Sequence, residues 1–316
     1  MLRIPPSLNH DTRTHFAVGD IHGNLDGFQK ILTHAQLIDK KGNWNGKNVV
    51  LAQLGDVIDR GPKSFGAWRY LQKLQMQAKQ SQGKVVRLLG NHEDMLCQGY
   101  ETEKTRPLQK HLKLQKLILQ DIKQADVQAV YHDGYYTYSH AGFGSEVLRR
   151  TIEKIEKKNP SWQDIAAVCN LHFRNIHDPT LQVSRKEHPY LHQVPKRRPG
   201  GKHPRGGILW EDYRDLSQSV EKKEEHFAGP QIVGHTTNPV HYIRSVQSGR
   251  LICIDSKILL NCLSYLKIDY QQGRIEKICR SRYIRTWKAM PIYVCQKGQT
   301  PPWQMTWQNS SRESAE

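Results

Sequence analysis

The feature that most constrains the fold is a pattern repeated in the first third of the chain, where short apolar segments end at glycine and a polar side chain. The three segments, each with the pair that follows it, are residues 14–18 before Gly19-Asp20, 48–54 before Gly55-Asp56, and 84–89 before Gly90-Asn91. Apolar residues at helical spacing fill the intervals over 25–35 and 65–78. This alternation of strands and helices predicts a parallel sheet with crossover helices.

The three polar pairs all follow the carboxyl end of a predicted strand. In open α/β sheets, the ligand site lies in the crevice outside these strand ends. Glycine lets the backbone turn sharply just past a strand, so the neighbouring side chains can converge on one crevice from rigid supports. The sequence therefore predicts a functional site at this edge of the sheet.

The middle of the chain adds helices and one more strand that ends in a polar cluster. Residues 108–130 form a basic, Gln-rich helical region whose mostly apolar row predicts packing against the core. A predicted strand over 135–139 runs into His140-Ala141-Gly142. Helical spacing then predicts two helices, over 145–157 and 161–175.

The last part of the chain changes character. Residues 177–207 are rich in Pro, Gly, His, Lys and Arg and lack periodicity, which predicts a long basic loop. Later apolar runs predict an antiparallel meander that forms a second sheet, and they cover 231–234, 241–246, 250–255, 262–268 and 274–279. We therefore predict a single domain over residues 1–300, with a helical insertion at about 103–130, followed by a disordered tail over 301–316.

Composition is ordinary for a globular protein with a real core, since 37% of the 316 residues are apolar and 24% are charged. No stretch approaches the roughly 18 consecutive apolar residues that a membrane span needs. The first residues lack the apolar segment of a signal peptide. The six cysteines form no Cys-x-x-Cys pair, which favours thiols in a reducing compartment. We expect a cytoplasmic protein, although a route of export without an N-terminal signal stays open.

The formal net charge of +17 attracts anions, which include nucleic acid, acidic membranes and phosphorylated substrates. A merely soluble basic protein would have the same charge, so the charge alone names no partner.

Five short clusters carry the residues that suit chemistry. In chain order they are Gly19-Asp20-Ile21-His22-Gly23, Gly55-Asp56-Val57-Ile58-Asp59-Arg60-Gly61, Gly90-Asn91-His92-Glu93, His140-Ala141-Gly142 and Gly234-His235-Thr236. Carboxylates and imidazoles together suit Mn, Fe or Zn, whereas a purely oxygen set would favour Mg or Ca. One carboxylate can bridge two ions about 3.5–4 Å apart, and such a pair polarises phosphate and lowers the pKa of a bound water. The clusters predict a metal-dependent phosphoesterase.

Any one cluster would be a weak signal. A lone histidine is more often a surface or core residue than a ligand, and a lone Asp-Arg pair is usually a surface ion pair. The functional interpretation depends on all five clusters following predicted strands. Histidines outside the clusters are interpreted as structural, and these are His10, His34, His111, His132, His172 and His177.

In this order, the clusters resemble the phosphoprotein phosphatase family of calcineurin-like metallophosphoesterases, over about residues 14–257. Residues 53–62 (QLGDVIDRGP) and 88–93 (LLGNHE) look closest to the bacterial Shewanella-like Ser/Thr protein phosphatases. The resemblance implies an α/β fold, a metallophosphoesterase sandwich of two mixed β-sheets flanked by helices. It also implies a cofactor of two divalent metal ions, with Mn expected and Fe or Zn as alternatives.

The same resemblance implies a role for each cluster residue. The implied metal ligands are Asp20 and His22 for one ion, Asp56 as the bridge, and Asn91, His140 and His235 for the second ion. His92 resembles the general acid that protonates the leaving oxygen, with Asp59 as its carboxylate partner, because a carboxylate raises the pKa of an imidazolium. Arg60 resembles a phosphate clamp, since a planar guanidinium matches two phosphate oxygens.

The sequence departs from the family pattern at a second phosphate-binding arginine. Related bacterial enzymes often place it two residues after a tryptophan, but here Asp212 stands two residues after Trp210. Arg214 is the nearest replacement, and Arg205 is the alternative. The long loop just before this point either contacts an acidic substrate or is solvated and mobile, and the second interpretation is slightly favoured. Its basic residues are Lys186, Lys196, Arg197, Arg198, Lys202 and Arg205.

The resemblance implies in-line hydrolysis of a phosphomonoester, without a phosphoenzyme. The expected partner is a phosphorylated protein or peptide, with phosphate on Ser/Thr and with Tyr as an alternative. One alternative that shares the motifs is a symmetrical dinucleoside tetraphosphate or other nucleotide phosphohydrolase, whose signature usually lacks the acidic residue found here at Glu93. Another is a non-catalytic protein whose basic surface binds nucleic acid or an acidic partner, which the intact ligand set disfavours. The sequence does not fix the oligomeric state.

Overall fold

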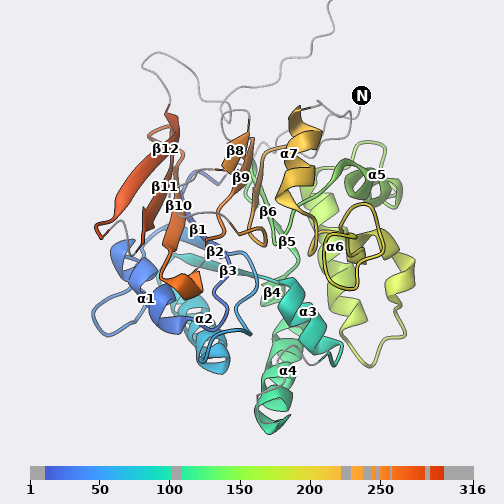
Figure 1. Cartoon of the computed structure of the whole chain (residues 1–316), viewed down its shortest axis with the longest axis horizontal. Coiled ribbons are helices and arrows are strands. Elements are labelled where there is room, and N and C mark those ends of the chain that lie inside the picture. Colours follow the sequence, from blue (N-terminus) through green and yellow to red (C-terminus); the bar gives the residue numbers. More distant parts are fainter. Residues whose placement is uncertain are drawn as a thin grey trace, which may run out of the picture.

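The computed structural model describes residues 11–100, 108–221, 229–237, 244–246, 250–256, 258–281 and 285–294 (Figure 1). The predicted disordered tail over 301–316 and the histidine at His10 lie outside these ranges. So do the first residues of the predicted insertion and part of the apolar run over 241–246.

A seven-stranded sheet forms the centre of the described part of the chain. Its strands, in spatial order, are β12 (Lys288–Val294), β11 (Arg274–Arg280), β10 (Leu263–Asp269), β1 (Thr14–Val18), β2 (Val49–Gln53), β3 (Lys84–Leu88) and β4 (Val127–Gln128). β1 to β4 are parallel neighbours, whereas β10, β11 and β12 are antiparallel to their neighbours. The predicted parallel arrangement of the first three strands is confirmed.

A five-stranded sheet, also counted over the described ranges, packs against the first. Its spatial order is β5 (Val130–His132), β6 (Thr137–Ser139), β7 (Gln231–Val233), β9 (Leu251–Cys253) and β8 (Arg244–Val246). β6, β7 and β9 are parallel, and β5 and β8 are antiparallel strands at the two edges. The mixed character of both sheets confirms the predicted fold class.

The prediction that the later apolar runs form one antiparallel meander in a second sheet is wrong. The runs divide between the two sheets, because β10 pairs antiparallel with β1 and draws β11 and β12 into the first sheet. Without β10, the outer edge of β1 would present unpaired backbone groups. Alternating apolar residues indicate that a segment is a strand, but they do not indicate the strand with which it will pair.

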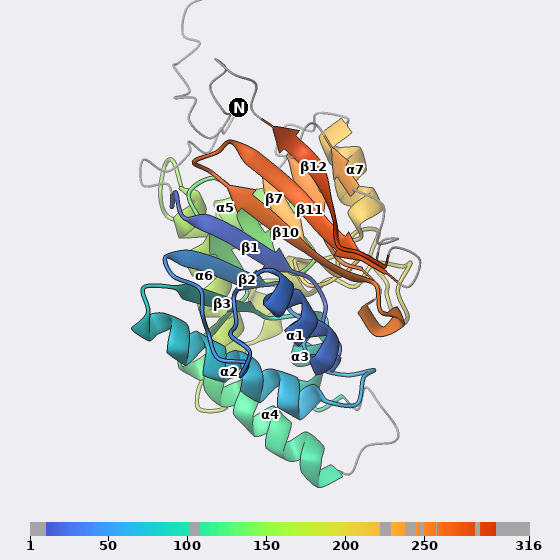
Figure 2. The ribbon, with the colours of Figure 1, turned by 90° about the vertical axis from the view of Figure 1, so that its left-hand side faces the viewer.

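Helices cover both outer faces of this sandwich (Figures 1 and 2). They are α1 (Leu25–His34), α2 (Ser64–Gln80), α3 (Asn91–Cys97), α4 (Leu108–Lys123), α5 (Ser145–Glu153), α6 (Trp162–Ile176) and α7 (Tyr213–Glu221), with short 3-10 turns at Arg185–Glu187, Pro189–His192 and Ile258–Leu260. α4 ends earlier than the predicted helical region over 108–130, because Ala125 takes a positive φ of 58° and turns the chain into β4. No helix in the described ranges is long and apolar enough to cross a membrane.

Alternating side chains of the central strands serve two separate layers of core. On β1, Phe16 and Val18 face the helix layer, whereas Ala17 faces the second sheet. Tyr138 and Ile232, from β6 and β7, close this inter-sheet layer from the other side, and both are fully buried. Figure 2 shows the larger sheet with α1, α2 and α4 along one side and α7 beyond the second sheet. The strands are therefore rigid on both faces, so the loops at their carboxyl ends have firm supports.

Candidate metal centre

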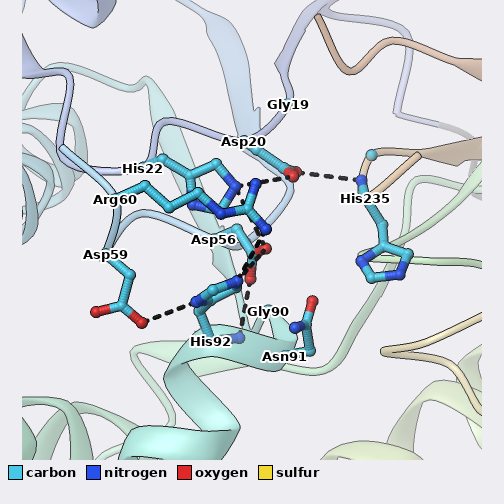
Figure 3. Close-up of polar contacts among 12 residues, drawn as sticks. Gly19, Asp20, His22, Asp56, Asp59, Arg60, Gly90, Asn91, His92 and His235 are labelled. Atoms are coloured by element: carbon cyan, nitrogen blue, oxygen red, sulfur yellow. Dashed lines mark hydrogen bonds and ion pairs between the residues drawn. The ribbon is translucent and has the colours of Figure 1, made fainter. Parts of the chain in front are cut away.

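All five polar clusters lie at the carboxyl ends of strands and meet in one place. Figure 3 shows residues of four of them, and His140 of the fifth lies 2.9 Å from Asn91 and 3.1 Å from His235. Strands from both sheets contribute, which puts side chains from distant parts of the sequence side by side. The contributing strands are β1 for Asp20 and His22, β2 for Asp56, Asp59 and Arg60, β3 for Asn91 and His92, β6 for His140, and β7 for His235.

The backbone at these turns is unusual. Five non-glycine residues in the clusters have a positive φ, a conformation that side chains rarely adopt, and they are His22, Asp56, Asp59, Arg60 and His235. The space is also tight, since a Cβ atom at Gly90 would lie 2.2 Å from both the backbone N and Oδ1 of Asp56. Glycine is thus required where the β2 and β3 turns meet.

Two groups of ligand atoms share the Asp56 carboxylate. In the first, His22 Nε2 lies 3.5 Å from Asp20 Oδ2 and 3.8 Å from Asp56 Oδ2. In the second, His140 Nε2 lies 3.5 Å from Asp56 Oδ1 and 3.1 Å from His235 Nδ1. The two carboxylate oxygens of Asp56 therefore face different imidazoles, as a residue that bridges two ions would.

Hydrogen bonds behind the histidines fix which nitrogen is available. Nδ1 of His22 donates to the carbonyl of Ile58 at 3.1 Å, and Nδ1 of His140 donates to the carbonyl of Leu54 at 2.7 Å. In the neutral imidazoles, the Nε2 atoms then carry the lone pairs. His140 Nε2 lies 2.9 Å from Asn91 Oδ1 and 3.1 Å from His235 Nδ1, so three candidate ligand atoms lie close together. Second-sphere carbonyls such as those of Ile58 and Leu54 are typical of metal-ligating histidines.

The charge states of these groups also suit metal binding. Burial opposes ionisation of Asp56, but the neighbouring imidazoles of His140 and His92 hold the pKa of its carboxyl below the usual range. Burial and the nearby His140 lower the pKa of His235, so its imidazole is neutral. Carboxylates and neutral imidazoles are the forms that bind divalent ions. The residues present therefore fit a divalent metal centre.

His92 lies at the start of α3, between two carboxylates (Figure 3). Its Nδ1 is 2.8 Å from Asp59 Oδ2, and its Nε2 is 3.2 Å from an Arg60 nitrogen and 3.9 Å from Asp56 Oδ2. Burial disfavours the imidazolium, but Asp56 and Asp59 outweigh it and raise the pKa of His92 to about 9. His92 also lies near enough to His22 and Asp56 to complete a metal group with them. Its role as an acid therefore stays a prediction.

Glu93 has a positioning role that the sequence did not reveal. Its carboxylate is fully buried and accepts hydrogen bonds from the backbone N–H groups of Asp56, Val57 and Ile58 at 2.8–3.1 Å, and from Gly90 at 3.0 Å. It thus fixes the β2 turn that carries Asp56. Only the position of Glu93 after Asn-His was noticed in the sequence.

Asp255 is a second buried residue that the sequence reasoning missed. It follows β9 and is 2% exposed, and burial together with the negative charge of Asp20 raises the pKa of its carboxyl. A Cβ atom at Gly19 would lie 3.0 Å from the Asp255 Cα atom. The signal was available, since the apolar run over 250–255 ends in this carboxylate as the earlier strands end in theirs.

The two candidates for the second phosphate-binding arginine, Arg214 and Arg205, do not stand at the end of a strand as the cluster residues do. The Arg214 side chain is exposed on α7, and its backbone N–H donates to Asp212 Oδ1 at 2.9 Å. The Arg205 guanidinium donates to Ser219 at 2.6 Å and lies 3.4 Å from the buried carboxylate of Glu211. The described contacts thus tie Arg205 to α7 and the residues before it.

The family model of the calcineurin-like phosphoesterases matches residues 16–236 of the chain, which include all five clusters. The chain belongs to the calcineurin-like phosphoesterase family. This phosphoesterase is 26% identical over 274 residues to Shewanella-like protein phosphatase 1 of Plasmodium berghei, covering 80% of this chain and 71% of the relative. It is 36% identical over 110 residues to Shewanella-like protein phosphatase 2 of Arabidopsis thaliana, covering 32% and 28% of the two chains.

Solved structures agree on the fold of this phosphoesterase. The cold-active protein-tyrosine phosphatase of a psychrophilic Shewanella species superposes with a TM-score of 0.64 at 19% sequence identity, covering 88% of this chain and 80% of that structure. The likeness confirms the predicted two-sheet phosphoesterase sandwich, and the family confirms the predicted class of metallophosphatase.

Proposed function

We propose that this phosphoesterase is a dinuclear metal-dependent protein phosphatase that hydrolyses phosphomonoesters. The observation that carries the proposal is the shared Asp56 carboxylate, whose two oxygens face separate imidazoles at 3.8 Å and 3.5 Å. The proposed ligands are Asp20, His22 and Asp56 for one ion, and Asp56, Asn91, His140 and His235 for the other. Mn is the proposed metal, with Fe or Zn as alternatives, because the set mixes carboxylate, amide and imidazole ligands.

Two divalent ions at this centre would polarise the phosphoryl oxygens and supply hydroxide near neutral pH. The protein's own part is to orient the substrate and move a proton. Nε2 of His92 is proposed to protonate the leaving oxygen, while the hydrogen bond from Nδ1 to Asp59 orients the ring and favours its protonated form. Arg60, beside His92 at 3.2 Å, is proposed to contact the phosphoryl oxygens.

The proposed substrate is a phosphorylated protein or peptide, carrying phosphate on Ser, Thr or Tyr. Two relatives of this chain are named protein phosphatases, and a structural neighbour is a protein-tyrosine phosphatase, so both kinds of residue enter the proposal. A cytoplasmic location is part of the same proposal, and the free thiols of Cys97, Cys169 and Cys279 fit a reducing compartment.

The test is a panel of phosphoserine, phosphothreonine and phosphotyrosine peptides beside a dinucleoside tetraphosphate, with metal-stripped protein reloaded with Mn, Fe, Zn or Mg. We expect metal-dependent release of phosphate from at least one class of peptide, and none from Asp56→Asn under any metal. Faster turnover of the dinucleoside tetraphosphate than of every peptide would replace the proposed substrate class. Salt-dependent binding of nucleic acid without hydrolysis would favour the non-catalytic alternative.

A further inference from the structure

The basic loop over residues 177–207 is held to the body by ion pairs. Four of its arginines contact carboxylates that lie on α3, on α7 or just before α7. The pairs are Arg185 with Asp94 at 2.6 Å, Arg197 with Asp215 at 3.2 Å, Arg198 with Asp212 at 3.2 Å, and Arg205 with Glu211 at 3.4 Å. These ion pairs place the loop against the body of the protein, which differs from the slightly favoured interpretation of a solvated, mobile loop.

Arg198 and Arg197 each contact a carboxylate through Nη2 alone, but Arg198 differs from the other three arginines in its buried Nε atom. One terminal nitrogen, Nη2, contacts Asp212 Oδ2, and the contact leaves the rest of the fork available. Its Nε atom is buried and has no hydrogen-bond partner among the described residues. Arg205, by contrast, contacts Glu211, Ser219 and, at 3.9 Å, Asp215.

The segment that holds Arg198 lies against the metal centre. The ring of Trp210 meets the ring of His235 edge-on, with centroids 5.9 Å apart. The backbone N–H of Tyr213 donates to the Thr236 hydroxyl at 3.1 Å. Asp212 sits between these two contacts in the sequence.

We infer that Arg198, oriented by Asp212, is the second cation that contacts the phosphoryl group of a phosphomonoester substrate. The inference rests on the proposed function and deepens it. Asp212 stands at the position, two residues after Trp210, where related enzymes often carry an arginine. Here the carboxylate at that position holds an arginine brought in from the basic loop. Arg198 takes the place of the sequence-based choice, Arg214, whose side chain is exposed on α7.

The chemistry explains why an arginine in this place matters. A phosphoryl group in transfer spreads negative charge over its equatorial oxygens, and Arg60 approaches from the β2 turn only. A second guanidinium, held by the segment that lies against His235, would contact oxygens that Arg60 leaves exposed. Asp212 is a positioning residue, since it limits the rotamers of a long side chain before substrate arrives. The basic loop thereby becomes a wall of the substrate site.

The test compares Arg198→Ala and Arg198→Lys with Arg197→Ala, a matched control one residue away that also loses a loop ion pair. Arg60→Ala serves as the positive reference, and metal content and thermal unfolding are checked for each variant. Calorimetry measures the binding of inorganic phosphate to Mn-loaded protein, and kcat/KM is measured on one phosphopeptide. We expect Arg198→Ala to weaken phosphate binding roughly 10-fold or more, as loss of a charged hydrogen bond would, and to lower kcat/KM about 10²-fold. Arg198→Lys should be only partly active, because an ammonium lacks the planar fork.

A double-mutant cycle separates positioning from general stability. Asp212→Asn should lower kcat/KM less than Arg198→Ala does. When Arg198 is already alanine, adding Asp212→Asn should lower kcat/KM little further. Equal phosphate binding in Arg198→Ala and the parent, beside a loss in Arg60→Ala, would overturn the inference and leave the proposed function standing. A loss confined to Arg214→Ala would also overturn it. Arg198-dependent phosphate binding in a protein that hydrolyses no phosphopeptide would refute the proposed substrate and uphold the clamp.

Discussion

The metal centre and the basic loop are both assembled from residues far apart in the sequence, but they are held in different ways. In the centre, strands that are already paired deliver the clusters, and the backbone turns just past each strand end. In the loop, long arginine side chains reach out to carboxylates on α3 and around α7. One region is positioned by its backbone and the other by charge.

This difference has consequences for how each region responds to change. Substituting a metal ligand in the centre lowers metal binding and catalysis, while the sheets that support the centre remain paired. Substituting one arginine or its carboxylate shifts part of the loop and leaves the ligands in place. We therefore expect all-or-none losses at the centre and graded losses at the loop.

The largest effect is expected for Asp56→Asn. An amide at this position loses the charge that faces both His22 and His140, so both metal groups weaken together. Hydrolysis should be abolished, and elemental analysis should show that both ions are depleted. Full metal occupancy with retained activity would show that the two groups do not depend on a shared carboxylate.

A smaller loss is expected for His92→Asn, which tests whether His92 is an acid or a ligand. As an acid, its removal should lower turnover by roughly 10²–10⁴ while the metal content stays the same. The loss should shrink on aryl phosphates, whose leaving groups need less protonation. Loss of metal, or an equal loss on aryl and alkyl phosphates, would assign His92 to metal binding with His22 and Asp56 instead.

A graded effect is expected where the loop meets α3. Asp94 is buried and accepts hydrogen bonds from His177 at 2.9 Å and Arg185 at 2.6 Å, so Asp94→Asn weakens both contacts. We expect the free energy of unfolding to fall by about 2 kcal/mol, as for a hydrogen-bonded charge, with kcat/KM reduced less than 10-fold. The control is Asp26→Asn, which breaks an exposed pair with Lys63 and should change stability by about 0.5 kcal/mol or less. Equal effects in the two variants would refute the idea that Asp94 holds the loop.

The smallest effect concerns pH. Burial lowers the pKa of His172 on α6 to about 4 and that of His192 in the loop to about 3, and their Nε2 atoms lie 2.8 Å apart, beside His188 and Arg185. The unfolded chain binds these protons at a higher pH, near 6.5. Their contribution to stability is thus complete above about pH 6.5 and declines as the pH falls toward 4. Hydrogen exchange should show loosening of the loop at pH 5, reduced in His192→Gln. If the pH dependence of hydrogen exchange is the same in His192→Gln, the two histidines do not cause the loosening of the loop.

The regions also differ in how well the sequence predicts them. The first three strands and their polar ends were predictable because an apolar run, a glycine and a carboxylate or amide are all local signals. α4 was predicted too long because Ala125, which turns the chain, is an ordinary helix former. β12 was missed because Pro291 interrupts its pattern, and the strand lies at the edge of the sheet, where proline is tolerated.

The same distinction applies to the site. The cluster residues could be found because each stands beside a glycine or a strand end. The pairing of Arg198 with Asp212 joins two segments through side chains alone, and the sequence of neither segment indicates that it pairs with the other. The role of Glu93 was equally hidden, because its partners are backbone N–H groups that every sequence has.

The five residues of the metal centre with a positive φ lower the stability of the fold while their side chains supply the chemistry of the centre. Each of His22, Asp56, Asp59, Arg60 and His235 holds a backbone conformation that costs on the order of 1 kcal/mol or more for a residue with a side chain. Glycine or asparagine would adopt the same turns with less strain. A duplicated copy of this chain that no longer had to catalyse its reaction would gain stability from substitutions at these positions. We therefore expect the metal centre to be the first part of such a copy to change.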